Sequence, residues 1–103
     1  MLRHSLTGKQ KSFLRSMGMG IDPVVQMGKD GLTPAVVQSA SEAIKKRELI
    51  KVRVLQNSAD DAEQIKSMIE TLTERVDAEL VQIIGRNGLL FKRNFDKPKI
   101  ELP

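Results

Sequence analysis

The sequence contains no cysteine, and its 103 residues include a single histidine. The absence of cysteine excludes disulfides, thiolate nucleophiles and thiolate metal sites. The histidine, His4, lies at an N-terminus that we expect to be frayed, so a histidine-based metal site or acid–base catalyst is disfavoured. We therefore expect no metal and no other cofactor.

Aromatic residues are also scarce, since Phe13, Phe91 and Phe95 are accompanied by neither tyrosine nor tryptophan. A protein that binds nucleic acid by stacking bases on an aromatic sheet needs several exposed rings. If this chain binds nucleic acid, contacts to the phosphates and the backbone must supply most of the affinity.

Long apolar runs are absent as well. No run approaches the roughly 18 apolar residues of a membrane span, and the stretch MLRHSLTGKQK lacks the apolar core of a signal peptide. We expect a cytoplasmic, monomeric protein with no membrane partner. At this length we expect one domain, residues 1–103, with residues 1–5 and 96–103 as flexible or extended ends.

Positive charge is in excess, with a net charge of +4 and a pI of about 9.6. Residues 60–79 carry seven acidic and two basic side chains, whereas the rest of the chain carries six acidic and fifteen basic ones. This split predicts one acidic and one basic side, a pattern typical of nucleic-acid-binding proteins. Two ordinary solvated faces with an uneven charge distribution remain the alternative.

Hydrophobic periodicity predicts seven elements in the order α-β-α-β-α-β-β, which is typical of α/β or α+β folds. Helical spacing predicts helices at about 7–17, 34–46 and 57–76, and alternating or short apolar runs predict strands at about 24–27, 48–55, 79–84 and 89–93. The second and third helices would be right-handed crossovers between parallel strands. The last hairpin would add one antiparallel strand.

Local signals indicate where these elements begin and turn. Thr33 is the predicted N-cap of the second helix, with a proline at the first helical position. Ser58 is the predicted cap of the third helix, where Asp60 and Asp61 would complement the helix dipole. Asn87-Gly88 is a strong signal for the turn of the last hairpin.

The stretch QMGKDGLTPAVV holds a G-x-x-G pattern, Gly28-Lys29-Asp30-Gly31, between a predicted strand and a predicted helix N-terminus. Such an N-terminus attracts anions, glycines permit a close approach to the backbone, and Lys29 adds a positive charge. Asp30 fits less well because a carboxylate repels phosphate; it would stabilise the turn or accept a hydrogen bond from a ribose hydroxyl. From the residues alone, anion binding and a plain strand–helix turn remain equal alternatives.

A second G-x-x-G spans residues 85–88, where a hairpin turn explains it, although Arg86 at its tip could reach a phosphate. Lys51 and Arg53 share one face of a strand, which is either solvated or turned toward phosphate. Asp60 and Asp61 resemble a catalytic pair only in sequence, because adjacent helical residues point in different directions. Neither G-x-x-x-x-G-K-[ST] nor G-x-G-x-x-G occurs, which disfavours a nucleotide-using enzyme.

Five segments together resemble the CRM domain family (chloroplast RNA splicing and ribosome maturation), in its stand-alone bacterial YhbY type. They are LTGKQKSFLRSMG, PVVQMGKDGLT, ELIKVRV, VQIIGRNGLLFKR and the terminal KIELP, and they cover nearly all of residues 6–103. The resemblance implies a two-layer α+β domain with a four-stranded mixed sheet, similar to the C-terminal domain of translation initiation factor 3. It also implies binding of structured RNA, with bacterial members linked to precursors of the large ribosomal subunit.

The resemblance also assigns RNA contacts to positions of this sequence. The family's G-x-x-G loop, expected at the RNA backbone as in KH domains, falls on Gly28, Lys29, Asp30 and Gly31. The family's basic positions lie on the first helix, the second strand and the end of the last strand, and they fall here on Lys9, Lys11, Arg15, Lys51, Lys92 and Arg93. Arg53 would extend the contact beside Lys51. Phe91 departs from the family, where we expect a tyrosine.

The leading hypothesis is a non-enzymatic RNA-binding protein that helps to assemble the large ribosomal subunit, with rRNA or a pre-ribosomal particle as partner. The alternative is a protein-interaction module whose acidic third helix docks a basic ribosomal protein. A hydrolase or nucleotide-dependent enzyme is the third hypothesis. It lacks support because the sequence shows no histidine–carboxylate set, no metal-ligand cluster and no P-loop.

Overall fold

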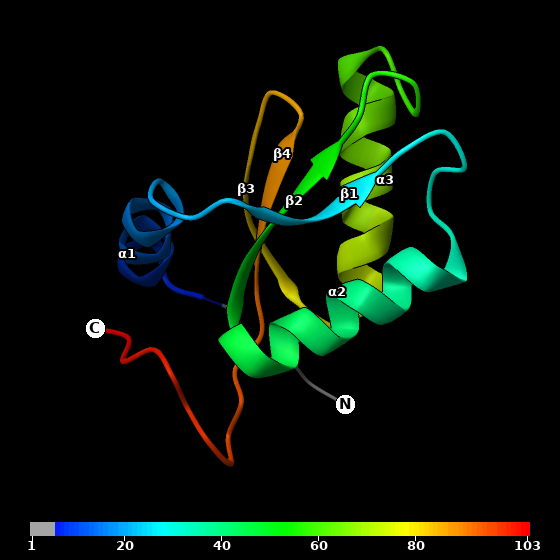
Figure 1. Cartoon of the computed structure of the whole chain (residues 1–103). Coiled ribbons are helices and arrows are strands. Elements are labelled where there is room, and N and C mark those ends of the chain that lie inside the picture. Colours follow the sequence, from blue (N-terminus) through cyan, green and yellow to red (C-terminus); the bar gives the residue numbers. More distant parts are fainter. Residues whose placement is uncertain (1–5) are drawn as a thin grey trace.

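The computed structural model describes residues 6–103, so the expectations for His4 and for residues 1–5 lie outside the described residues. Seven elements follow in the predicted order (Figure 1): α1 Gly8–Gly18, β1 Pro23–Met27, α2 Pro34–Arg47, β2 Leu49–Val54, α3 Ala62–Arg75, β3 Glu79–Ile84 and β4 Asn87–Phe91. The strands form one mixed sheet in the order β1-β2-β4-β3. The α+β class and the four-stranded mixed sheet are therefore confirmed.

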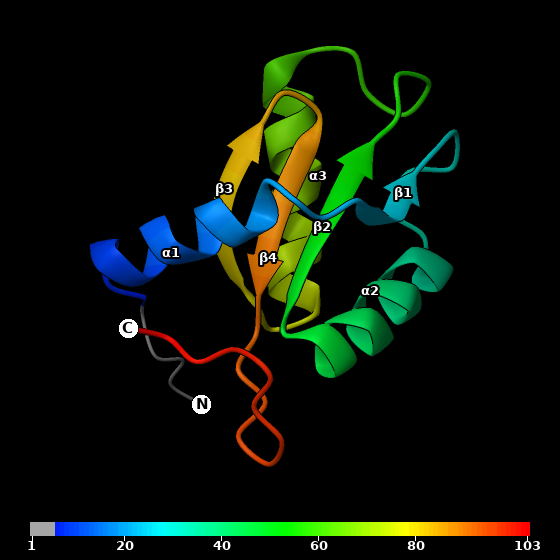
Figure 2. The ribbon, with the colours of Figure 1, turned by 60° about the vertical axis from the view of Figure 1, so that its left-hand side comes forward.

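The position of β4 determines how the chain crosses the sheet. β1 and β2 are parallel neighbours joined by α2, whereas β4 is antiparallel to both β2 and β3. α3 thus connects two strands that are not adjacent, because the hairpin inserts β4 between them. As a result, the loops after β1 and β2 and the turn of the hairpin all lie at one end of the sheet (Figure 2), which we call the loop end.

Each helix begins at a side-chain cap. Thr7 and Gln10 form a reciprocal capping box at α1, and the Thr33 hydroxyl accepts the Val36 N–H at 3.1 Å at α2. The predicted cap of α3 was wrong: Asp61 accepts the Gln64 N–H at 2.8 Å, so the helix begins at Ala62. The residues before it form a separate loop instead of a first helical turn.

The sheet buries apolar side chains on both faces. Ile50, Val52 and Val54 of β2 are fully buried and pack against the α2 and α3 side, where Ile44 and Ile69 complete the main cluster. The other face carries a smaller cluster of Leu14, Leu49, Val81, Leu89, Phe91 and Ile100. Figure 2 shows α1 crossing this second face while α3 lies behind the sheet. Helix α1 therefore adds a partial third layer to the two expected layers.

The hairpin turn differs from the prediction. Ile84 pairs with Asn87, so the two turn residues are Gly85 and Arg86, and Gly85 has the positive φ of 56°. Gly88 lies in β4 instead, where an added Cβ would come within 2.5 Å of Cγ2 of Ile69. The second G-x-x-G thus serves a turn at its first glycine and close helix–sheet packing at its second.

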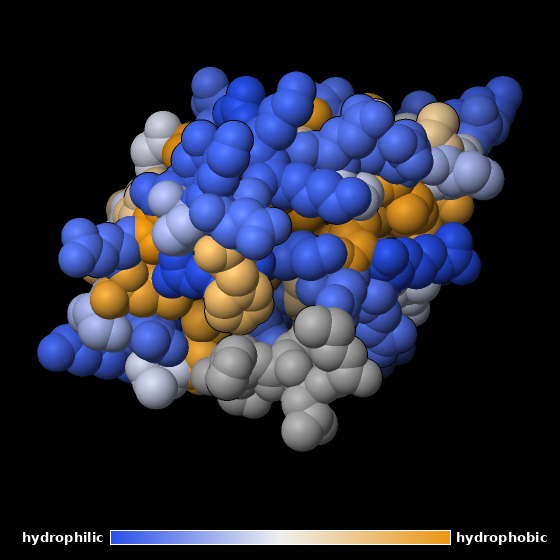
Figure 3. All heavy atoms as spheres, turned by 90° about the horizontal axis from the view of Figure 1, so that it is seen from below, coloured by the Kyte–Doolittle hydropathy of each residue, from blue (hydrophilic) through white to orange (hydrophobic). Residues whose placement is uncertain are grey.

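The C-terminal segment folds back across the sheet at the end opposite the loop end, which we call the tail end. Ile100 is buried, and its carbonyl accepts a hydrogen bond from Arg93 at 2.7 Å. Viewed from this end, the surface is mainly hydrophilic with scattered apolar residues (Figure 3). Within residues 6–103, no helix is long and apolar enough to cross a membrane.

Candidate nucleic-acid interface

The first G-x-x-G, which we call the glycine loop (residues 28–31), joins the buried end of β1 to the N-terminus of α2. The Gly31 N–H donates to the Gly28 carbonyl at 2.9 Å, and this bond closes a tight turn. The Thr33 N–H then donates to the Gly31 carbonyl at 3.2 Å, which directs the chain into the helix. The turn therefore leads through Leu32 and Thr33 to the N-terminus of α2, the positive end of the helix dipole.

The two glycines of this loop have different structural roles. Gly31 has a φ of +67°, a backbone conformation that residues other than glycine adopt only at a cost in free energy. Gly28 has no such requirement, and a Cβ there would make only ordinary contacts, at 3.7 Å to Cδ1 of Leu55. The fold thus explains Gly31 but not Gly28. A close approach of a ligand to the backbone would explain Gly28.

The loop between β2 and α3 supports the glycine loop. The Leu55 N–H donates to the Met27 carbonyl at 2.8 Å, just before the glycine loop begins. Arg86 holds the same supporting loop from the other side, because its guanidinium donates to the carbonyls of Val54 and Ala59 at 3.3 and 2.7 Å. It also lies 3.8 Å from the exposed Asp60 carboxylate. The Arg86 guanidinium thus has acceptors within the chain, and its contact with a phosphate stays a prediction.

The tip of the glycine loop carries Lys29 and Asp30, both exposed. Within residues 6–103, neither side chain has a hydrogen-bond or ion-pair partner. The structure therefore gives no support to the idea that the Asp30 carboxylate stabilises the turn. Both charged groups face solvent, one as a donor and one as an acceptor.

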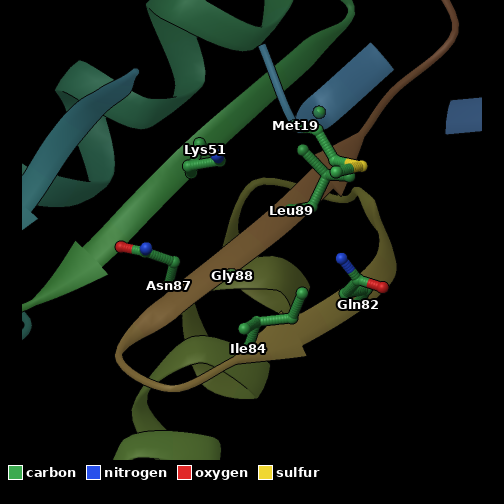
Figure 4. Close-up of a pocket in the computed structure, with 8 residues that line it drawn as sticks. Met19, Lys51, Gln82, Ile84, Asn87, Gly88 and Leu89 are labelled. Atoms are coloured by element: carbon green, nitrogen blue, oxygen red, sulfur yellow. The ribbon is translucent and has the colours of Figure 1, made fainter. Parts of the chain in front are cut away.

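Lys51 lies on the α1 side of β2, on the part of that face which α1 leaves open (Figure 4). Arg53, two residues further along the strand, shares this face. Arg53 is exposed and pairs in register with Gln26, two residues before Gly28. At about 4.8 Å between strands and about 3.3 Å per residue, the Cα atoms of Arg53 and Gly28 are roughly 8 Å apart. The structure thus brings the strand cations and the glycine loop to the same end of the sheet.

The basic residues of α1 divide into two groups. Lys11 and Arg15 are half-buried and four residues apart, and Met19, four residues further, borders the open part of the sheet face. Residues at this spacing share one side of a helix, so Lys11 and Arg15 lie along the flank of α1 nearest Lys51. Lys9 is exposed and, two positions from Lys11, points in another direction.

Lys92 and Arg93 lie at the tail end, away from the other predicted contacts. The Lys92 ammonium donates to the Val76 carbonyl at 3.1 Å, at the C-terminus of α3. Arg93 contacts the Glu48 carboxylate at 3.2 Å and lies 5.4 Å from the centre of the Phe91 ring. The structure does not bring these two cations together with the glycine loop, and their charged groups already have partners within the chain.

Sequence reasoning did not identify two polar side chains that lie beside these cations. Gln82 and Asn87 lie on the open face next to Lys51. The Asn87-Gly88 pair predicts a turn, so the sequence does not place Asn87 in a strand. The observed pairing of Asn87 with Ile84 puts it in β4 instead. The β-bulge between Leu80 and Gln82 likewise shifts the alternation of β3, so that Gln82 lies on the same face as Val81 and not on the opposite one.

Comparison with known proteins decides the family. A family described as the CRS1/YhbY (CRM) domain matches residues 6–92, which include the glycine loop and the cations of α1 and β2. The chain belongs to the CRM domain family.

Two relatives show how far the likeness extends. This CRM domain is 42% identical over 98 residues to "Probable RNA-binding protein YqeI" of Bacillus subtilis, covering 95% of this chain and 99% of that protein. It is 34% identical over 99 residues to a protein of Haemophilus influenzae named "RNA-binding protein", covering 96% of each chain.

A solved structure supports the fold. The solution structure of the hypothetical protein SAV1595 from Staphylococcus aureus matches with a TM-score of 0.77 and 43% sequence identity. The match covers 96% of this chain and all of that one. The CRM domain therefore has a solved relative of the same architecture.

Proposed function

We propose that this CRM domain binds RNA and acts as an rRNA-binding factor in assembly of the large ribosomal subunit. The observation that carries the proposal is the loop end of the sheet. There Lys29 and Arg53 are exposed, in a chain whose relatives are named RNA-binding proteins. The role in assembly of the large ribosomal subunit is inferred from the family resemblance.

The geometry suggests how the RNA backbone would bind. A phosphate at the glycine loop would meet the positive end of α2, the Lys29 ammonium and a backbone that has no Cβ at Gly28. Asp30 would accept a hydrogen bond from a ribose 2′-hydroxyl, which distinguishes RNA from DNA. Lys51, Arg53 and the flank of α1 would extend the contact along the strand. We assign Lys92 and Arg93 to the fold instead, because both cations have acceptors within the chain.

Filter binding to a structured fragment of large-subunit rRNA tests the loop. The double variant Gly28→Asp and Lys29→Ala should bind at least about tenfold more weakly, a loss of about 1.4 kcal/mol or more. Gly28 is chosen because it lacks the positive φ of Gly31, so its substitution leaves the backbone unstrained. Circular dichroism should show an unchanged melting temperature.

The control is Glu70→Gln, an exposed substitution on α3 that raises the net charge by one, whereas the loop variant lowers it by two. It should leave RNA affinity within about twofold of wild type. Equal affinities for wild type and the loop variant would contradict the proposed role of the glycine loop. In cells, cross-linking followed by sequencing of the attached RNA should enrich precursor large-subunit rRNA, whereas an even signal over messenger RNA would contradict the ribosomal assignment.

One specific observation supports a second candidate function, the docking of a basic ribosomal protein on α3. α3 exposes Glu63, Glu70 and Glu74, so an acidic surface is available for a basic ribosomal protein. Pull-down after nuclease treatment distinguishes this function, because a salt-stable protein partner lost in a Glu70→Lys and Glu74→Lys variant would support it. No retained protein would contradict it.

A further inference from the structure

The part of the sheet face that α1 leaves open contains a hollow of about 190 Å³ between α1 and the hairpin. Two exposed apolar side chains, Met19 and Ile84, are 83% and 62% exposed and lie on opposite sides of it (Figure 4). Leu89 and the backbone of Gly88 form its floor. Exposed apolar side chains on two sides of one hollow indicate a surface that a flat apolar group can cover.

One buried polar atom at this hollow has no hydrogen-bond partner within the described residues. The Asn87 side-chain oxygen is buried and accepts no hydrogen bond within the part of the chain that the structure describes. A buried acceptor without a donor is rare and costly in proteins. The terminal torsion of asparagine is broad and roughly two-fold, so rotation of the amide can turn this oxygen toward a donor in the hollow. Gln82 lies on the opposite side and Lys51 beside Asn87 (Figure 4).

Resting on the proposed RNA-binding function, we propose that this hollow binds one unpaired RNA base. Met19 and Ile84 contact the two faces of the base, and they take the place of aromatic rings, which are scarce in this chain. The amides of Asn87 and Gln82 each offer a donor and an acceptor to the polar edges of the base. Lys51 binds the phosphate beside it or a base carbonyl.

The hollow and the glycine loop are placed to contact one strand of RNA. Lys51 lies three residues before Val54, whose partner Met27 immediately precedes the glycine loop. At about 3.3 Å per residue, the two sites are roughly 10 Å apart along β2. Arg53, on the same face between them, supplies a cation for the connecting phosphates. This charge favours a nucleic acid over a polypeptide as the occupant.

The experiment compares two RNAs. One is a blunt duplex, and the other is the same duplex with a single-stranded 3′ overhang of about five nucleotides, which supplies unpaired bases for the hollow. Wild type should bind the overhang RNA about fivefold more tightly than the blunt duplex in filter binding. The variant Met19→Ser and Ile84→Ser should lose this preference and keep its affinity for the blunt duplex. Both side chains are exposed, so the variant should fold normally.

The matched control is Phe95→Ser, which removes an apolar side chain that is 73% exposed at the tail end and should leave both affinities unchanged. Nuclear magnetic resonance adds a direct measurement, because the Asn87 side-chain amide signals should shift with the overhang RNA and not with the blunt duplex. A hollow variant that keeps the preference, or a wild type without one, would overturn the base site. Weak binding of both RNAs by the Gly28→Asp and Lys29→Ala variant would then show that the proposed function still stands. A wild type that binds neither RNA would overturn both.

Discussion

The two ends of the sheet both carry basic side chains but use them differently. At the loop end, Lys29 and Arg53 are exposed at the surface. At the tail end, the Lys92 ammonium donates to a helix-terminal carbonyl and Arg93 contacts a buried carboxylate. Residues of the same type in the same sequence therefore divide into cations used by the fold and cations left for a partner. The comparison teaches that a missing intramolecular acceptor, and not charge alone, marks a candidate RNA contact.

Glu48 explains why Arg93 is held at the tail end. It ends α2 with a φ of 63° and is fully buried. Its carboxylate accepts backbone N–H bonds from Asn94, Lys99 and Ile100, in addition to the contact with Arg93. One side chain thus fixes the whole segment after β4 against the sheet.

The largest effect should come from removing this carboxylate. Glu48→Ala leaves three backbone donors without their acceptor and removes the ion-pair partner of Arg93, and breaking such a buried pair costs roughly 3–5 kcal/mol. Urea unfolding followed by circular dichroism should show this loss of stability. RNA affinity of the folded fraction should stay the same. A stable variant with weakened RNA binding would contradict the division between the two ends.

A smaller loss of stability should separate the two G-x-x-G segments. Gly88→Ala forces a Cβ to within 2.5 Å of Ile69, so overpacking should cost about 1–3 kcal/mol. Gly28→Ala makes only ordinary contacts and should change stability by less than about 0.5 kcal/mol. The same urea titration measures both variants. Equal losses would contradict our distinction between a glycine required by packing and one left free for a ligand.

Acid should weaken the tail end before the loop end. Burial alone would raise the pKa of Glu48, but the N–H bonds from Asn94, Lys99 and Ile100 and the charge of Arg93 together lower it below the ordinary glutamate value. The unfolded chain therefore binds this proton more readily than the folded one. The stabilisation is complete at neutral pH, falls as the pH drops below about 4.3, and is lost below the folded pKa.

The measurement is the urea midpoint between about pH 7 and about pH 3. The stability difference between wild type and Glu48→Gln should shrink as the pH falls. A difference that stays constant over this range would show that Glu48 keeps its ordinary pKa in the folded protein.

Much of the fold could be predicted because local signals and packing agree. The stripe of Ile65, Ile69 and Leu72 predicted α3, and Thr33 with Pro34 predicted the start of α2. The turn of the hairpin could not be predicted, because Asn-Gly favours a turn wherever it stands and only the contact with α3 decides its place. Tertiary packing against Ile69 here outweighs the local signal.

The candidate site was predictable in part. The glycine loop has the predicted position before a helix N-terminus, and Lys51 and Arg53 share a face as their spacing indicated. Nothing in the spacing of Glu48 indicated that it would engage Arg93, because the two residues meet only through the pairing of β2 with β4. The fate of each cation depends on acceptors that are distant in sequence, and a single sequence does not reveal them.

The smallest expected effect gives the sharpest comparison of the two ends. Lys29→Met and Lys92→Met each remove one positive charge and change the net charge equally. If only Lys29 contacts phosphate, the slope of log affinity against log salt should become less steep by about 1 for Lys29→Met and stay unchanged for Lys92→Met. Lys92→Met should instead lower stability by about 0.3–1 kcal/mol, because it removes a cation from the C-terminus of α3. Slopes reduced equally in both variants would place RNA at both ends of the sheet, and an unchanged slope for Lys29→Met would remove Lys29 from the contact; in either case the intramolecular acceptor would no longer predict which cations bind.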